Sequence, residues 1–197
     1  MRVVAAPDKF RGTGSAQQVA LAIAGAVSGL GGSTDMVPMA DGGEGTLDVL
    51  GGPNRSTTVT GPLGEPVEAQ WRLDGHTAVI EMARASGLDL VGGQAGNSPL
   101  DATTAGTGEL ILAAVEKGAR RVIIGLGGSA TTDGGLGALR AMGSPARFRG
   151  IELLVACDVR TRFVDAAEVF GPQKGASPAQ VAMLRGRLER LAQVYAG

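Results

Sequence analysis

The chain has 197 residues, of which 44% are hydrophobic, and this suits a globular protein of one large domain or two small ones. Because the chain has 18 Lys and Arg residues and 19 Asp and Glu residues, its formal net charge is -1, and nothing favours binding to nucleic acid or to an anionic membrane through bulk electrostatics. No apolar run reaches the ~20 residues of a membrane span, and Pro7-Asp8 interrupts the N-terminus before a signal-peptide core could form, so we expect a cytoplasmic protein.

The first predicted elements are a strand, a loop and a helix. Residues 2–6 are a short apolar run that suits a buried parallel strand, and the loop PDKFRGTG follows it. Ser15 is the predicted N-cap of a helix that ends at Gly31-Gly32. A second strand, within TDMVPMA, then leads to Asp41-Gly42-Gly43 and to a short helix over 45–50. Each of these strands therefore ends in a polar loop that contains glycine.

A change of composition near residue 52 predicts a domain boundary. Turn formers cluster at residues 51–54, and the segment that follows is rich in β-branched residues. We therefore assign residues 1–52 to one domain and residues 53–197 to another. In the second domain, Asp74-Gly75 separates VEAQWRL from HTAVIEM and predicts a β-hairpin with a type I′ turn. His76, directly after this turn, is expected to be exposed and to have no functional role.

The remainder of the chain alternates helices with strands. Periodic apolar residues predict a helix within 106–119 and a last helix from Pro178 to about Tyr195, which needs a partner surface. Between them we expect a helix through Met142 and two buried strands, RRVIIGL and IELLVAC. The single cysteine, Cys157, ends the second of these strands and is therefore interpreted as a buried structural thiol.

Two Asp-Gly-Gly motifs indicate an anion-binding site. One is residues 41–43, and the other lies in the stretch 125–139, GLGGSATTDGGLGAL, between a predicted strand and a predicted helix. Glycine lets backbone N–H groups approach an anion, and a helix N-terminus adds partial positive charge, so phosphate is the predicted ligand. The candidate phosphate-binding residues are Gly42, Gly43, Glu44, Gly127, Gly128, Ser129 and Thr131. The alternative is that both motifs are ordinary tight turns.

Acidic residues beside these motifs are candidates for catalysis and for metal binding. Asp41, Glu44 and Asp133 are of the type that holds Mg2+ or accepts a proton from an attacking hydroxyl group. Asp41 is the first choice for a base or a metal ligand, and Glu44 is the second metal ligand. The alternative for Asp41 is ordinary capping of the helix that follows, and the alternative for Asp133 is a packed turn between domains.

Six segments occur in the order found in the bacterial glycerate kinase family, which the chain resembles over nearly its whole length. They are APDKFRGTGSAQQVALAI, VPMADGGEGT, ARASGLDLV, TTAGTGELILAAVEKGARRVIIGLGGSATTDGGLGAL, ACDV and VFGPQKGASPAQV. The resemblance implies an enzyme that uses ATP and Mg2+ to phosphorylate D-glycerate, with the 2-hydroxyl group favoured. It also implies an α/β fold of two unlike domains with the substrate cleft between them. Residues 1–52 would belong to a flavodoxin-like or Rossmann-like parallel sheet, incomplete here, and residues 53–197 to an inserted mixed-sheet domain.

The resemblance also indicates which side chains would serve such a cleft. Glycerate brings a carboxylate and two hydroxyl groups, so its pocket requires a cation, a base and donors around the transferred phosphoryl group. The candidate catalytic residues are Asp41, Asp8, Lys9 and Asp133. Arg11 and Lys174 are the further candidate cations for the substrate or phosphate. The alternative for these loop charges is a solvated surface.

Two departures from the family pattern keep a second interpretation open. Family members usually continue far beyond FGPQKGA, and they commonly have a longer stretch before ACDV. The second interpretation is a truncated, non-catalytic homologue, or one part of a split enzyme, which binds anions or a complementary C-terminal segment. A homodimer is also left open. Residues 125–130 alternatively resemble the phosphate loop of the galactokinase and homoserine kinase superfamily.

Overall fold

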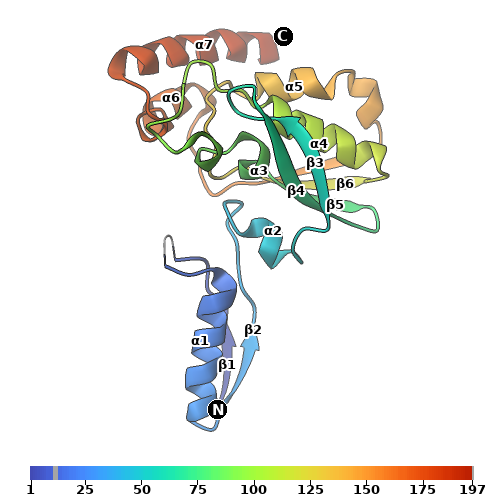
Figure 1. Cartoon of the computed structure of the whole chain (residues 1–197), viewed down its shortest axis with the longest axis vertical. Helices are drawn as coiled ribbons and strands as arrows, with labels where there is room; N and C mark the ends of the chain where they lie inside the picture. Colours follow the sequence, from blue (N-terminus) through green and yellow to red (C-terminus); the bar gives the residue numbers. More distant parts are fainter. Residues whose placement is uncertain (11–12, 197) are drawn as a thin grey trace.

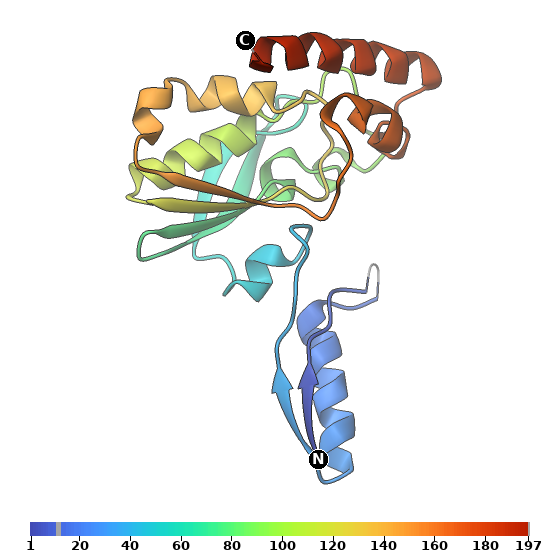
Figure 2. The same ribbon diagram turned by 180° about the vertical axis from the view of Figure 1, so that it is seen from behind.

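Two parts of unequal size make up the molecule (Figure 1). The structure, a computed structural model, describes residues 1–10 and 13–196, so Arg11, a candidate anion-binding residue, lies outside the described residues. A small N-terminal unit extends from a larger α/β domain, and the two chain termini lie at opposite ends of the long axis (Figures 1 and 2). The α/β class and the two unlike parts agree with the prediction.

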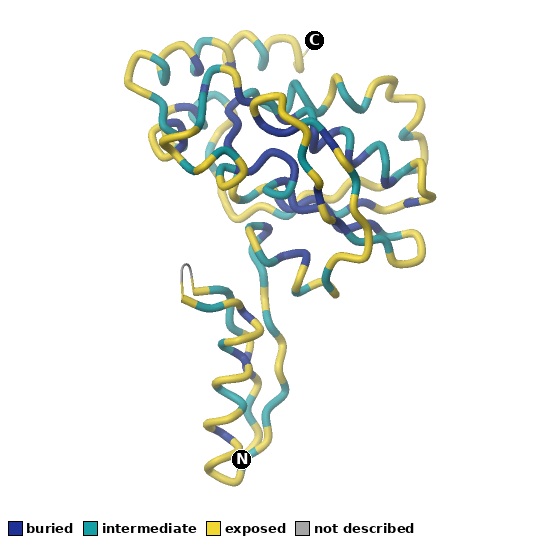
Figure 3. The backbone as a smooth tube through the Cα atoms, in the orientation of Figure 1, coloured by how far each residue is buried: buried dark blue, intermediate teal, exposed yellow. Residues whose placement is uncertain are grey.

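The N-terminal unit consists of two parallel strands and one helix. β1 (Arg2–Ala5) pairs with β2 (Ser33–Met36), and α1 (Ala16–Gly29) connects them. The Ser15 side chain accepts a hydrogen bond from the N–H of Gln18, and the Gln18 side chain accepts one from the N–H of Ser15, so the predicted N-cap is confirmed. Two strands and one helix bury little surface, and most of this unit is exposed (Figure 3).

The larger domain is built around a five-stranded mixed sheet. Its strands, in spatial order, are β3 (Arg55–Thr60), β4 (Pro66–Asp74), β5 (Thr77–Glu81), β6 (Arg121–Gly125) and β7 (Glu152–Ala156). β3, β4 and β5 are antiparallel neighbours, whereas β5, β6 and β7 run parallel. The hairpin predicted at Asp74-Gly75 is confirmed, because Asp74 pairs with Thr77 across the turn. The predicted type I′ turn is wrong, because that turn needs a positive φ at both central residues, and of Gly75 and His76 only Gly75 has one, at 54°. His76 is exposed, as expected.

Helices pack on both faces of the sheet rather than on one (Figure 2). They are α2 (Thr46–Val49), α3 (Ala83–Ser86), α4 (Ala105–Glu116), α5 (Leu136–Met142), α6 (Ala166–Phe170) and α7 (Pro178–Ala196), with short 3-10 turns at 89–91, 145–148, 163–165 and 172–174. α4 and α5 are stacked over the sheet (Figure 2). The core between α4 and the sheet is centred on Trp71, Ile80, Leu110 and Val122.

The last helix has the partner surface that its apolar face predicts. Leu184 and Leu188 of α7 are buried in a small cluster with Ala167 of α6, and Leu100 packs against this cluster. α7 lies at the end of the larger domain that is farthest from the N-terminal unit (Figures 1 and 2). Within residues 1–10 and 13–196, no helix combines the length and the apolar character needed to cross a membrane.

The expectation of a buried strand at residues 151–157 is wrong. β7 is an edge strand, and its Leu153, Leu154 and Val155 are 40%, 39% and 58% exposed. The physical reason is that α5 packs on α4 rather than over β7, so the helix layer stops short of the edge of the sheet. Cys157, directly after β7, is exposed as well, and its interpretation as a buried thiol is therefore also wrong.

The segment between the two parts belongs to both of them. The two sheets are separate, and residues 50–54 link α2 to β3. α2 precedes the boundary predicted after residue 52, yet its Leu47 is fully buried and donates its N–H to Glu81 of β5 in the larger domain. The exact boundary therefore stays a prediction.

Backbone contacts between glycines join the two parts. The N–H of Gly127, which follows β6, donates a hydrogen bond of 3.0 Å to the carbonyl oxygen of Gly42. A Cβ atom added at Gly127 would lie 2.4 Å from the Cα of Gly43. One added at Gly42, whose φ is 89°, would lie 2.2 Å from the carbonyl oxygen of Ala156. Only residues without a Cβ atom permit backbones to approach this closely.

Gly127→Ala should therefore destabilise the protein by about 1–3 kcal/mol, because the added methyl group forces two backbones apart. Urea denaturation of the two proteins measures this difference. Gly25→Ala in α1 is the matched control, because its Cβ would meet no atom within 4 Å. Alanine is the better helix former, so this control should gain up to about 1 kcal/mol. Equal effects of the two substitutions would contradict the steric explanation.

Candidate active site

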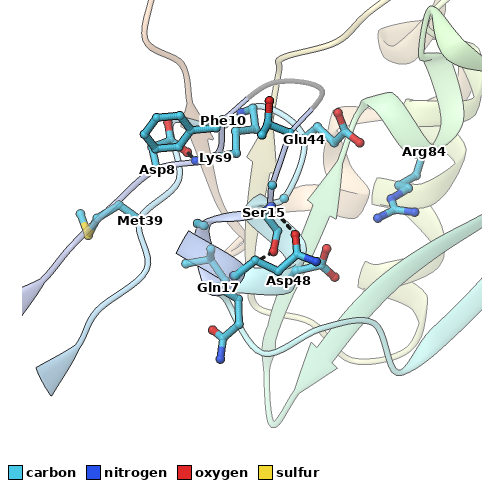
Figure 4. Close-up of a pocket in the computed structure, with 15 residues that line it drawn as sticks. Asp8, Lys9, Phe10, Ser15, Gln17, Met39, Glu44, Asp48 and Arg84 are labelled. Carbon is cyan, nitrogen blue, oxygen red and sulfur yellow. Dashed lines mark hydrogen bonds between the residues drawn. The ribbon is translucent and has the colours of Figure 1, made fainter. Parts of the chain in front are cut away.

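A cavity of about 620 Å3 lies where the N-terminal unit meets the larger domain (Figure 4). Its charged and polar lining residues include Asp8, Lys9, Ser15, Gln18, Glu44, Asp48 and Arg84, with Phe10 and Met39 as larger apolar ones. Pockets that bind small molecules typically measure about 300–1,000 Å3, so this cavity has the size of a ligand site.

The cavity residues lie beyond the carboxyl ends of parallel strands. β1 ends at Ala5, and the loop that begins with Pro7 carries Asp8 and Lys9. β5 ends at Glu81, and Arg84 follows it on α3. Ligands of open α/β sheets bind in crevices at this end of the strands. The sequence places these loops there because Pro7 and the short apolar runs end the strands abruptly.

The lining of the cavity carries both signs of charge. Asp8, Glu44 and Asp48 contribute carboxylates, whereas Lys9 and Arg84 contribute cations. Figure 4 shows Asp8 and Phe10 on one side of the cavity and Arg84 on the other. A small anion that enters the cavity therefore meets cations on two walls, and a hydroxyl group that it carries meets carboxylates.

Asp41 holds Lys9 at the edge of the cavity. Its Oδ1 atom accepts hydrogen bonds from the N–H of Gly43 at 2.8 Å and from Lys9 Nζ at 3.1 Å. The Gly43 N–H, followed by Lys9, holds the pKa of Asp41 below its usual value, although burial opposes the shift. Asp41 is therefore an anion at neutral pH. Asp8 is organised in a similar way, because its carboxylate accepts the N–H of Lys9 at 2.6 Å.

The second Asp-Gly-Gly motif lies elsewhere. Asp133 accepts hydrogen bonds from the N–H and the hydroxyl group of Thr104 and from the N–H groups of Gly135 and Gly137, at 2.7–3.1 Å. It lines a different cavity, of about 430 Å3, together with residues of α7 such as Leu188. The structure therefore does not bring Asp133 into the cavity of Lys9. Its catalytic role stays a prediction, and its hydrogen bonds support the alternative of a packed turn.

Lys174 is buried beneath the glycine-rich stretch. Its Nζ atom donates to the hydroxyl group of Ser129 at 2.8 Å and to the carbonyl oxygen of Thr131. Burial lowers the pKa of Lys174 from 10.5 to about 8, and the charge of Asp133 partly opposes this shift. Lys174, Ser129 and Thr131 thus form a connection within the larger domain, and their predicted phosphate contacts are not tested by this geometry.

The predicted glycine amides are partly occupied within the protein. The N–H of Gly43 donates to Asp41, and the N–H of Gly127 donates to Gly42. Gly128, with a φ of 72°, turns the chain so that its carbonyl oxygen accepts the N–H of Leu88. Phosphate binding by these glycines stays a prediction, but two of the donors proposed for it already have partners.

Sequence reasoning missed two charged residues of the site, Glu81 and Arg84. The Glu81 side chain is 2% exposed and pairs with Arg84, which lines the cavity. One signal was present in the sequence, since a glutamate at the end of the apolar run TAVIE is unusual. Carboxylates are rarely buried without a partner, and the nearest cation along the chain is Arg84.

A metal ion would find few protein ligands here. Within residues 1–10 and 13–196 there is no group of three or more His, Cys, Asp or Glu side chains placed to hold a metal. Mg2+ does not require such a group of protein ligands, because it commonly binds one or two carboxylates together with phosphate oxygens and water. Glu44, Asp48 and Asp8 line the same cavity and have the donor chemistry for such a site.

Comparisons with known proteins agree on one family. A sequence model described as the glycerate kinase family matches residues 3–147 and 143–197. The chain is 41% identical to a glycerate 2-kinase of Escherichia coli strain K12, over 98% of this chain and 61% of that protein. It is 43% identical to a glycerate kinase of Bacillus subtilis strain 168, over 90% of this chain and 56% of that protein. The chain therefore spans about three fifths of the length of these curated relatives.

A solved structure matches the fold as well. It is described as glycerate kinase 2 from Salmonella typhimurium LT2 and is 36% identical to this chain, with a TM-score of 0.85. The match covers 100% of this chain and 63% of that structure. The Escherichia coli alignment runs over 233 positions, more than the 197 residues of this chain, so it contains gaps. Because the two matched pieces of the family model meet at residues 143–147, a gap falls between α5 and β7, where the edge strand is uncovered.

Lys174→Met should remove a rise of stability with pH. Between pH 8 and 10.5 the unfolded chain keeps the proton on Lys174 and the folded chain releases it, so the free energy of unfolding rises with pH, by at most about 3 kcal/mol. Urea denaturation from pH 7.5 to 10 should show this rise in the parent and a smaller one in the variant. Lys117→Met, at an exposed lysine, should retain the slope of the parent. Identical slopes in all three proteins would contradict the prediction.

Proposed function

Since the chain belongs to the glycerate kinase family, we propose that it transfers the γ-phosphoryl group of ATP to a hydroxyl group of D-glycerate, with the 2-hydroxyl group favoured. The observation that carries the proposal is the cavity at the junction, in which cations and carboxylates face one another within a chain that the family model matches almost throughout. We also propose that the reaction takes place in the cytoplasm.

The chemistry of glycerate fits this cavity. Glycerate is a small anion with two hydroxyl groups, and it needs a cation for its carboxylate and a base for the attacking hydroxyl group. Lys9 and Arg84 are the cations of the lining, and Asp8 is a carboxylate held by a backbone hydrogen bond. In the transfer, the hydroxyl group gives its proton to the base, its oxygen bonds to the γ-phosphorus, and the bond to ADP breaks.

We assign different roles to the two aspartates. Asp8 lines the cavity and is the candidate base. Asp41 does not line the cavity, and its Oδ1 atom accepts a hydrogen bond from Lys9, whose side chain is 15% exposed. A lysine fixed in this way places a positive charge beside the transferring phosphoryl group without loss of side-chain freedom during the reaction.

Mg2+ fits the proposed site as a partner of the nucleotide. Glu44 and Asp48 are the carboxylates that would hold it, with Asp41 as a ligand predicted from the sequence. When bound, the ion supplies positive charge that neutralises phosphate oxygens during transfer. Asp8, Glu44 and Asp48 of the lining repel a polyphosphate, and a bound Mg2+ ion would reduce this repulsion.

A second candidate function is a binding module that acts only with further polypeptide. It is favoured by the exposure of apolar residues on the N-terminal unit, where Val4 of β1 is 64% exposed and Met36 of β2 is 43% exposed. Such surfaces commonly mark an interaction site. A complementary chain, or a second copy of this one, would cover them. The galactokinase-like interpretation of residues 125–130 is not retained, because the family match assigns this stretch to glycerate kinases.

NMR of the product tests the proposed function directly. The 197-residue chain, incubated with ATP, Mg2+ and D-glycerate, should give phosphoglycerate whose phosphorus signal is split into a doublet by the single proton on the carbon atom at position 2. Splitting by the two protons on the carbon atom at position 3 would contradict the favoured hydroxyl group. If no product forms until a C-terminal segment from a relative is added, the second candidate function is supported instead.

Asp8→Asn should lower kcat by about 10²–10⁴-fold, the usual contribution of a general base. The side-chain oxygen that accepts the Lys9 N–H is retained, so the melting temperature should stay close to that of the parent. Asp35→Asn is the matched control, because Asp35 pairs with Arg2 on the N-terminal unit and is absent from the cavity lining. A variant at residue 8 with more than half of the parent kcat would exclude Asp8 as the base.

A further inference from the structure

One buried carboxylate connects two walls of the cavity. Glu81, the last residue of β5, has a side chain that is 2% exposed. Its Oε1 atom accepts the N–H of Leu47 in α2 at 2.7 Å, and its Oε2 atom accepts Arg84 Nε at 3.2 Å. α2 directly follows the first Asp-Gly-Gly motif, so the same side chain fixes that segment and Arg84 relative to each other.

The pairing with Arg84 is required by the burial of Glu81. A carboxylate removed from water is strongly destabilising unless a cation and hydrogen bonds compensate its charge. Arg84 is the only cation that forms an ion pair with Glu81 within the described ranges 1–10 and 13–196. Its guanidinium group is therefore held in place by a buried charge that has the Leu47 N–H as its other hydrogen-bond donor.

The contact of Arg84 leaves its outer edge available. Glu81 engages the Nε atom, and in the part of the chain that the structure describes neither terminal amino group of Arg84 has a hydrogen-bond partner. The side chain is 37% exposed and lines the cavity on the side away from Asp8 (Figure 4). Two parallel N–H groups of this kind bind a carboxylate or a phosphate in a bidentate manner.

The charge of the lining distinguishes between these two anions. Glu44 and Asp48 share the cavity with Arg84, and together with Asp8 the carboxylates outnumber the cations among the lining residues that the structure describes. A polyphosphate carries several negative charges and is repelled unless a metal ion accompanies it, whereas a carboxylate carries only one. The single positive charge of Arg84 is enough to compensate a carboxylate, but not a polyphosphate.

We propose that Arg84 binds the carboxylate of the acceptor substrate, and that Glu81 is the positioning residue that holds Arg84 and α2 in register. This inference rests on the proposed function for the identity of the acceptor. It adds a specificity determinant, because an arginine held by a buried carboxylate selects acceptors that carry a carboxylate over neutral polyols. Lys9, which Asp41 positions at the opposite wall, is not needed for the acceptor carboxylate and can bind the phosphoryl group.

Steady-state kinetics of Arg84→Gln tests the proposal on the 197-residue chain. The KM for D-glycerate should rise by about 10–100-fold, the range of a lost charge-assisted pair, with kcat and the KM for ATP within about threefold of the parent. Arg84→Lys should recover part of the loss. Glu81→Gln should raise the same KM by a smaller factor, and its melting temperature shows whether the fold is kept. Discrimination against glycerol should also decrease in Arg84→Gln.

Arg121→Gln is the matched control. Arg121 also donates its Nε atom to a carboxylate, that of Glu152, but it lies at the start of β6 and is absent from the cavity lining. Its KM values should equal those of the parent. A KM for ATP that rises instead in Arg84→Gln would assign the arginine to the nucleotide phosphates and overturn the inference, as would an unchanged KM for D-glycerate.

Calorimetric titration of D-glycerate separates this inference from the proposed function. Binding by the parent that weakens at least tenfold in Arg84→Gln supports the inference even when no turnover occurs, and in that case the proposed function fails alone. Turnover by the parent with equal D-glycerate binding by both proteins leaves the function intact and overturns the inference. A parent that neither binds nor phosphorylates D-glycerate overturns both.

Discussion

The architecture depends on one contact in which two backbones touch without intervening side chains. Gly127, after β6, donates its N–H to Gly42, and a Cβ atom at Gly127 would collide with Gly43. This contact brings the segment between β2 and α2 against the larger domain, and residues of this segment line the cavity together with the loop after β1. The glycines are therefore explained first by packing, and an anion is not needed to account for them.

Two carboxylates, Asp41 and Glu81, position the cations of the cavity that lies beside this contact. Asp41 holds Lys9, and Glu81 holds Arg84, so each cation of the lining is fixed by an acid behind it. Fixed charges of this kind stabilise a bound anion more effectively than mobile surface charges, because their orientation does not have to be established during binding. The N-terminal unit and the larger domain supply one such pair each, and the cavity lies between them.

Local signals in the sequence predicted most of the elements, because strand ends, caps and turns are determined by neighbouring residues. The cap at Ser15 and the hairpin at Asp74-Gly75 are examples. Burial of β7 was predicted wrongly, since it depends on whether a helix covers the sheet edge, and this is a tertiary property. The sequence also predicted Asp8 as a site residue, and Asp8 lines the cavity, but the contact of Glu81 with Leu47 required the fold to bring α2 against β5.

The absence of side chains at the junction limits how this cavity can change. The glycine contact at the junction cannot be varied freely, because a Cβ atom at Gly42 or Gly127 would collide with backbone atoms. The walls carry ordinary side chains and are open to variation, as at Asp48 and Arg84. Under the proposed function, new acceptor preferences can therefore evolve, or be engineered, by exchanging wall residues while the glycine contact between the two parts is left untouched.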